Sequence, residues 1–331
     1  MRSSAPGIAA TTRSTLTDVL AVDVSPFTPV SLFTYATLDS WLTALLLVIG
    51  GAYLYGVYLL RARGDAWPVS RTLLFVGGGL GTITLATLSG LAAYDDVLFD
   101  AHMVQHMLLA MVAPIFLALG APITLALRTI GRRPRKILLK LLHSRIARVL
   151  SFPVVSFALF VATPYALYFS GLYAATLQNR FLHEALHAHF LLVGCLFFWP
   201  LIGLDPLPGR LPYPGRALLM FLSMPIHAVL GLTIMQSNTI IAGNYYASLG
   251  LSWLHPAERQ NIGGGLLWAS GDLVSLLMLA ALIVQWIRAS HREGAREDRR
   301  LDRLESQEAA RNQLGAANPG AASSAAVRSA L

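Results

Sequence analysis

The 331-residue chain is 55% apolar and only 13% charged, with a formal net charge of +8 and a mean hydropathy of +0.58. An average soluble domain has about 25% charged residues, so this composition excludes an ordinary soluble globule, and its hydrophobicity excludes disorder over most of the length. The single cysteine, Cys195, excludes a disulfide framework and any cysteine-based zinc or iron–sulfur site. A multi-span membrane protein is the class that remains.

Seven stretches are long and apolar enough to cross a bilayer, which takes about 20 residues in a helix. They are residues 41–60, 72–94, 101–127, 152–173, 181–203, 217–241 and 262–287. Backbone inside a bilayer must satisfy its own hydrogen bonds, so each stretch is predicted to be a helix. We expect an all-α bundle of seven transmembrane helices over residues 37–288. An extracytoplasmic segment over 1–36 is expected before it, and a charged, then disordered, cytoplasmic tail over 289–331 after it.

The distribution of Lys and Arg predicts the orientation of these helices. With the N-terminus outside, the inner loops and the tail hold all but four of the 25 basic residues. Such an asymmetry is the positive-inside signal, so we expect the N-terminus outside and the C-terminus in the cytoplasm. The basic loop 128–151 is interpreted as a determinant of this topology. Nucleic acid is not an expected partner, because no nucleic-acid-binding fold accompanies the charge.

Two histidine pairs open the third and fifth predicted helices at their outer ends. His102 and His106 form one pair, and His183 and His187 form the other. A spacing of four residues places both members of a pair on one face of a helix. Two such helices can direct four imidazoles to one point, which is how helix bundles build metal sites. His227, on the sixth predicted helix, is expected to form the floor of the same cluster.

Other residues near these pairs are secondary candidates for the same metal site. Methionines accompany the first histidine pair at helical spacing, and thioether sulfur selects Cu(I). Acidic residues precede the third helix, where they attract cations, and one acidic residue at mid-bilayer is expected to face the bundle interior. The secondary candidates are His189, Met103, Met107, Asp96, Asp100 and Asp272. Copper is the expected metal, and zinc or haem iron, which imidazole also binds, are the less favoured choices.

Four other interpretations of the histidines stay open. The stretch 183–187 reads H-E-x-x-H, the pattern of a metalloprotease in which Glu184 would act as general base on a zinc-bound water. A haem protein would take one axial histidine from each helix. A copper transporter or tolerance protein would use polar groups deeper in the bundle, such as Asp272 and His227. In a structural scaffold the histidines would only hydrogen-bond between helices.

Four blocks of the sequence resemble the CtaG-type cytochrome c oxidase assembly factors, a family of bacterial multi-span proteins. They are AHMVQHMLLAMVAPIFLALGAPITLALR (101–128), LHEALHAHFLLVGCLFFWPLIGLDPLPGR (182–210), MPIHAVLGLTIM (224–235) and IGGGLLWASGDL (262–273). The resemblance covers about residues 40–287, in order. It implies a seven-helix protein of the bacterial cytoplasmic membrane that is not itself an enzyme.

The resemblance also implies a role for the histidines. The family assists assembly of haem–copper oxidase, and copper insertion is the step it implies, with an oxidase subunit or a periplasmic copper chaperone as partner. The motif histidines of the family match His102, His106, His183, His187, His189 and His227. One departure is visible. An acidic–glutamine pair is expected just before the glycines of the last helix, where this chain has Arg259, Gln260 and Asn261 after Glu258.

Overall fold

The computed structural model describes residues 26–35 and 39–317, and within these ranges every regular element is a helix. Six helices are long and apolar enough to cross a membrane, and a bent pair makes a seventh span if it is counted as one. The predicted all-α membrane bundle is therefore confirmed. Most of the predicted N-terminal segment lies outside the described residues, which include only α2 (Ser31–Thr34) from it.

The first three spans begin close to where hydropathy places them. The first is the single helix α3 (Ser40–Ala62), which starts where the Asp39 side chain accepts hydrogen bonds from the backbone N–H groups of Trp41 and Leu42. The second and third spans each contain a π-helical segment, a feature that recurs at functional sites. The second comprises α4 (Val69–Leu73), the π-helix η1 (Leu74–Leu80), α5 (Gly81–Leu88) and α6 (Gly90–Tyr94). The third comprises α7 (Phe99–Met107), the π-helix η2 (Leu108–Val112), α8 (Ala113–Leu119) and α9 (Pro122–Thr129).

The fourth span differs from the single helix predicted over 152–173. It consists of α12 (Pro153–Tyr168) and α13 (Leu172–Gln178), bent by 72° at the break between them. The Ser170 hydroxyl accepts the backbone N–H of Leu172 at this break, so a polar side chain replaces helical hydrogen bonding there. The bend matters for the site, because it places α13 across the end of the bundle.

The remaining spans are α14 (Arg180–Ile202), α15 (Tyr213–Met235) and the N-terminal part of α17 (Pro256–Ala317). The helix predicted to run to residue 241 thus ends earlier, at Met235. The polar run after it folds into a loop that Gln260 holds, since its side chain donates to the carbonyls of Ile234 and Thr239. The short helix α16 (Gly243–Ser248) follows this loop.

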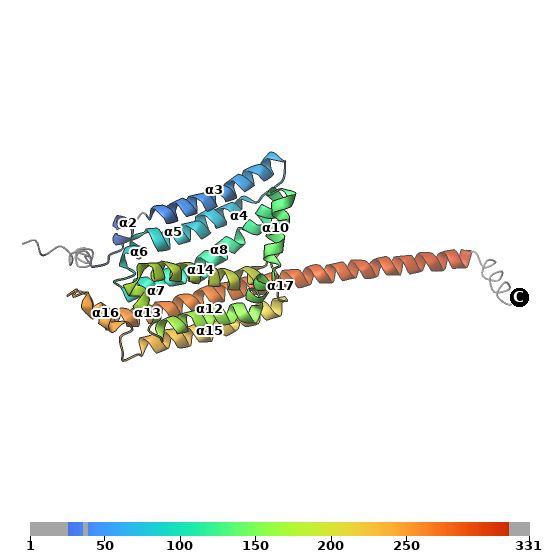
Figure 1. Ribbon diagram of the computed structural model, residues 1–331. Helices are drawn as coiled ribbons and strands as arrows, with labels where there is room; N and C mark the ends of the chain where they lie inside the picture. The colour runs from blue at the N-terminus through green and yellow to red at the C-terminus, as the bar shows by residue number, and fades with distance from the viewer. Residues whose placement is uncertain (1–25, 36–38, 318–331) are drawn as a thin grey trace, which may run out of the picture. The chain divides into compact units, whose positions relative to one another are not determined.

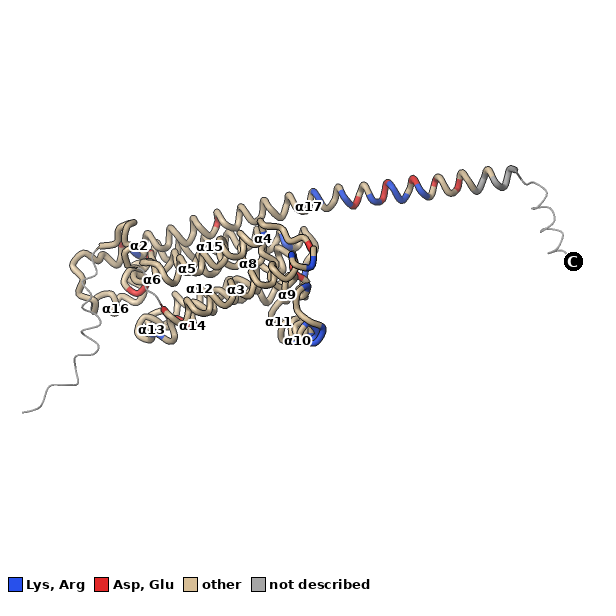
Figure 2. The backbone as a smooth tube through the Cα atoms, turned by 90° about the horizontal axis from the view of Figure 1, so that it is seen from above, with Lys and Arg blue, Asp and Glu red and all other residues tan. Residues whose placement is uncertain are grey.

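The two ends of the bundle differ in charge. Figure 1 shows α2, α6, α13 and α16 at one end and α10 (Arg132–Leu142) at the other. Figure 2 shows Lys and Arg gathered around α9, α10 and α11 (Arg145–Leu150), which we call the basic end. Such segregation is the pattern behind the positive-inside rule. The orientation with the N-terminus outside stays a prediction.

The chain divides into two compact units, Met1–Met278 and Leu279–Leu331. Within the first unit, α17 approaches α15 closely, because a Cβ on Gly231 would lie 2.6 Å from the carbonyl oxygen of Gly264. In the second unit α17 stays helical to Ala317, well into the tail over 289–331 that was expected to be charged and then disordered.

Candidate metal centre

Four buried imidazoles meet near the end of the bundle where α6 and α13 lie. His102 and His106 come from α7, and His183 and His187 come from α14. Ring centroids are 3.9 Å apart within the first pair and 4.6 Å apart within the second. Across the two helices they are 5.5 Å apart for His102 and His183, and 5.8 Å apart for His106 and His187. These four rings, the histidine cluster, lie together as their spacing along the chain predicts.

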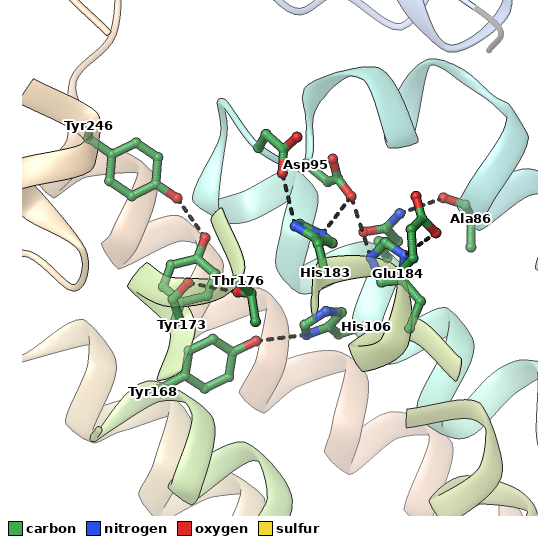
Figure 3. Close-up of polar contacts among 12 residues, drawn as sticks. Ala86, Asp95, His106, Tyr168, Tyr173, Thr176, His183, Glu184 and Tyr246 are labelled. Carbon is green, nitrogen blue, oxygen red and sulfur yellow. Dashed lines mark hydrogen bonds and ion pairs between the residues drawn. The ribbon is translucent and has the colours of Figure 1, made fainter. Parts of the chain in front are cut away.

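A buried carboxylate completes the arrangement. Asp95 follows α6 directly, and its Oδ2 lies 3.1 Å from His183 Nε2 and 3.5 Å from His187 Nε2 (Figure 3). Potential ligand atoms of Asp95, His102 and His183 all lie within 4.8 Å of one another. Burial raises the pKa of Asp95, and the neighbouring His183 ring opposes this effect. We call these three residues the Asp95–His102–His183 trio.

Several ring nitrogens of the cluster are buried without a hydrogen-bond partner. His102 is fully buried and neither of its nitrogens makes a hydrogen bond. Nε2 of His106 and Nε2 of His187 make none either, although the latter lies within ion-pair distance of Asp95. His183 lies within ion-pair distance of two carboxylates, but its ring nitrogens are not oriented to form a hydrogen bond with either. Each such nitrogen costs about 1–3 kcal/mol. Imidazole nitrogens gathered around a carboxylate are a donor set for a divalent transition metal, which would remove this cost.

Polar neighbours hold the second nitrogen of three of the rings. The Tyr168 hydroxyl lies 2.9 Å from His106 Nδ1, Asp96 Oδ1 lies 3.0 Å from His183 Nδ1, and Glu184 Oε2 lies 3.6 Å from His187 Nδ1. Metal-binding histidines are oriented by such contacts on the nitrogen that does not bind. Glu184, the glutamate of the H-E-x-x-H pattern, therefore lies beside the second histidine of its own motif.

The bend in the fourth span supplies the aromatic wall of the site. The Tyr173 ring, on α13, lies 4.7 Å from the His102 ring, and its hydroxyl is 2.7 Å from that of Tyr246. Figure 3 shows Tyr246, Tyr173 and Tyr168 along one side of the histidine cluster. Tyr246 lies on α16, outside the spans, and burial raises its pKa. The Tyr246 hydroxyl therefore acts as a neutral hydrogen-bonding group toward Tyr173.

The other two predicted histidines, His227 and His189, lie outside the histidine cluster. His227 Nδ1 is 2.8 Å from the Ser223 carbonyl oxygen on its own helix. Its ring lines a cavity of about 20 Å³, shared with His106 and Met107, that has room for one water molecule. His189 Nε2 lies 3.1 Å from the Thr163 hydroxyl on α12, away from the cluster.

Met103 and Asp100 each contact α17. Met103 packs against α17, where a Cβ on Gly263 would lie 3.2 Å from its Cγ. Asp100 pairs with Arg259 on α17, with 2.9 Å between Oδ2 and Nη1. Arg259 is the position at which this chain departs from the expected acidic residue, so the departure creates an ion pair.

Asp272 is buried on one side within α17. Its Oδ1 has no hydrogen-bond partner, and the adjacent Gly271 lies beside the His227 ring. Asp272 is thus a neighbour of His227 below the cluster. Of the secondary candidates, Asp96 lies in direct contact with a cluster histidine, His183.

Asp95, Tyr168 and Tyr173 are the site residues that the candidate set lacks. Asp95 belongs to the acidic run before the third helix. The turn between α6 and α7 directs its carboxylate toward His183, and the sequence does not reveal this turn. The tyrosines belong to a span whose bend is invisible to hydropathy. In the sequence, Asp95 is marked only by its position shortly before the helix that carries His102 and His106.

The fold and this cluster define a polytopic helical membrane protein with a buried histidine–aspartate centre. The chain belongs to the cytochrome c oxidase caa3 assembly factor (Caa3_CtaG) family, whose model matches residues 51–289. The resemblance inferred from the four sequence blocks is confirmed.

Curated relatives come from mycobacteria. Uncharacterized proteins of Mycobacterium bovis and Mycobacterium tuberculosis are each 40% identical over 272 residues, which is 80% of this chain and 41% of theirs. An uncharacterized protein of Mycobacterium leprae is 38% identical over 281 residues, covering 82% of this chain and 42% of its own. The chain thus spans about two fifths of the length of these relatives. No solved structure matches it.

Proposed function

We propose that this protein is an assembly factor for a respiratory cytochrome c oxidase that binds a copper ion as cargo at the histidine cluster. An oxidase subunit or a periplasmic copper chaperone then accepts the ion. Family membership supports the role in oxidase assembly. The observation that carries the metal site is the Asp95–His102–His183 trio, in which both nitrogens of His102 are buried and unpaired.

The donor set narrows the choice of metal. Two imidazole nitrogens and one carboxylate oxygen suit Cu(II) or zinc, whereas Cu(I) prefers sulfur. Met103 packs against Gly263 instead, and Met107 lines the mainly apolar cavity beneath the cluster. The preference for copper over zinc therefore rests on the family's link to a copper-containing oxidase and not on the methionines.

Release of the ion needs a side from which a partner can approach. The side chains of Asp96 and Glu184 are 55% and 53% exposed, whereas those of the histidines they contact are almost fully buried. These two carboxylates orient His183 and His187 from the accessible side. A partner's ligands would replace the histidines one by one from this side, in bacteria at the outer face of the cytoplasmic membrane.

The rival interpretations fit the geometry less well. The cavity of about 20 Å³ beneath the cluster is far too small for a haem. A transport path would need polar groups through the bundle, but that cavity is lined mainly by apolar side chains, including Phe160 and Leu267. The family description names assembly and no catalytic activity, and we propose that the protein is not an enzyme.

Metal analysis of the purified full chain tests this proposal. Copper content by mass spectrometry and an absorbance scan would compare the wild type with His102→Ala/His183→Ala, and oxidase activity would be measured in cells. His189→Ala is the matched control, because His189 lies on α14 but contacts α12. We expect stoichiometric copper without a haem band in the wild type and control, and loss of copper and of oxidase activity in the double variant. Equal copper in all three, or unchanged oxidase activity, would contradict the proposal.

A further inference from the structure

Charged and apolar residues occupy opposite faces of α10. At 100° per residue, its basic side chains fall within an arc of about 160°. They are Arg132, Arg133, Arg135, Lys136 and Lys140. Ile137, Leu138 and Leu141 lie on the other face, and Leu139 is the apolar residue that falls within the basic arc. A short helix of this kind is typical of an element that lies in the interface of a membrane.

The apolar face has no cover within the described part of the chain. Ile137 and Leu141 of α10 are 61% and 63% exposed, and Ile146 and Val149 of α11 are 73% and 58% exposed. No residue of either helix is buried. An exposed apolar surface rimmed by polar residues marks contact with a membrane or a partner.

The connections of α10 and α11 fix where this surface lies. The third span ends at Thr129 and the fourth begins at Pro153, so both ends of the connecting segment are held at one end of the bundle. Arg63 anchors the same region from α3, since its guanidinium donates to the carbonyl oxygens of Arg128 and Thr129. Figure 1 shows α10 running across the spans, and Figure 2 shows α10 and α11 beside the bundle. A helix across the spans at their end lies parallel to the membrane surface.

We propose that α10 and α11 form an interfacial element that rests in the headgroup layer and binds anionic phospholipid. The apolar face meets the acyl chains, and the basic face meets lipid phosphates. A bilayer is favoured as the occupant over a protein or a nucleic acid because it already surrounds the spans that hold both ends of the segment. It also offers an apolar layer directly beside an anionic one, which matches the two faces of α10.

Site-directed spin labels test the depth of α10. The full chain, in a Cys195→Ala background, would carry Leu141→Cys or its matched control Lys140→Cys in lipid nanodiscs. We expect accessibility to oxygen relative to an aqueous nickel chelate to be several-fold higher at position 141 than at position 140. Equal access of the chelate to both labels would overturn the proposal. Protection of both labels from both reagents would overturn it as well, because a protein would then cover the segment.

A charge comparison tests the lipid preference. We expect the wild type to unfold at a higher temperature in nanodiscs of phosphatidylglycerol than of phosphatidylcholine. Arg132→Gln/Arg133→Gln/Arg135→Gln should lose most of this difference. The control is Arg296→Gln/Arg299→Gln/Arg300→Gln in α17, which removes the same charge and should retain it. The proposal would be overturned if the α10 variant kept the full difference in unfolding temperature between the two lipids. It would also be overturned if the control lost this difference to the same extent.

Discussion

Two buried polar side chains at opposite ends of the bundle differ in their hydrogen bonding. Asp205, near the basic end, is 4% exposed and accepts hydrogen bonds from the Thr124 N–H at 2.7 Å and the Trp199 indole N–H at 2.8 Å. The Ile123 N–H and the Thr124 hydroxyl add two more bonds. His102, in the histidine cluster, is 0% exposed and has no partner on either nitrogen. Burial is therefore nearly equal, and only the degree of hydrogen bonding differs.

This difference separates structural from functional polarity in the bundle. Asp205 caps the first turn of α9 and ties it to α14, so its buried charge stabilises the packing of two helices. No hydrogen bond compensates either nitrogen of His102 within the described part of the chain, and unsatisfied buried polar groups in folded proteins call for a ligand, water or ion. The comparison implies that substitutions at the two ends should affect different measurements.

The largest effect is expected from His102→Leu/His183→Leu. Removing contacts that merely orient a ligand costs about 10–100-fold in metal affinity, so loss of two trio ligands should cost at least about 100-fold. The stability of the metal-free His102→Leu single variant should stay equal or rise, since this substitution deletes two buried nitrogens that make no hydrogen bond. Metal titration and thermal unfolding in detergent measure both. A large loss of stability without loss of metal affinity would show that the histidine cluster has a structural role and does not bind the metal.

Asp205→Ala is the converse experiment. It leaves the donors of Thr124 and Trp199 without their acceptor and should destabilise the protein by about 2–3 kcal/mol, with metal affinity unchanged. Asp65→Ala is the matched control, because Asp65 is half-exposed and pairs with Arg128 at 3.5 Å, and exposed pairs contribute about 1 kcal/mol or less. Equal unfolding temperatures for the two variants would remove the contrast.

The two neighbouring carboxylates sharpen the assignment within the cluster. Asp95→Asn should lower metal affinity by about 10–100-fold, whereas Asp96→Asn, which acts only through the orientation of His183, should lower it by less than about 10-fold. The comparison uses adjacent residues of the same type. A larger loss for Asp96 than for Asp95 would place the ligand on the exposed side of His183.

The smallest effect is expected at the methionine that packs against α17. Met103→Leu is close to volume-conserving and should change stability by less than about 1.5 kcal/mol. Affinity for Cu(I) and for Cu(II) should both be unchanged, because the Met103 side chain packs against Gly263. A selective fall in Cu(I) affinity would show that its sulfur binds the metal.

Hydropathy predicts most of the fold but not its breaks. It locates α3 and α14 to within a residue or two, because a span needs a continuous apolar run. The bend after Tyr168 and the end of α15 at Met235 escape it, since apolar residues resume beyond each break. At each break a single side chain, Ser170 or Gln260, makes hydrogen bonds that no window average detects.

Helical spacing predicts part of the site in the same way. Residues four apart must share a face, so the pairing within α7 and within α14 follows from sequence. Which face meets which neighbour does not follow from spacing, and Met103, a secondary candidate, packs against Gly263. The carboxylate of Asp95 enters the cluster through a turn, where no periodic pattern exists to be read.

Copper coordination is the most direct test of the central claim that the unpaired histidines form a metal centre. Electron paramagnetic resonance and X-ray absorption on the Cu(II)-loaded full chain would report the donor atoms. The trio predicts at least two imidazole nitrogens and an oxygen donor, all lost in His102→Leu/His183→Leu. An identical copper signal in that variant, or no copper bound by the wild type, would contradict the claim and leave the histidines with a structural role.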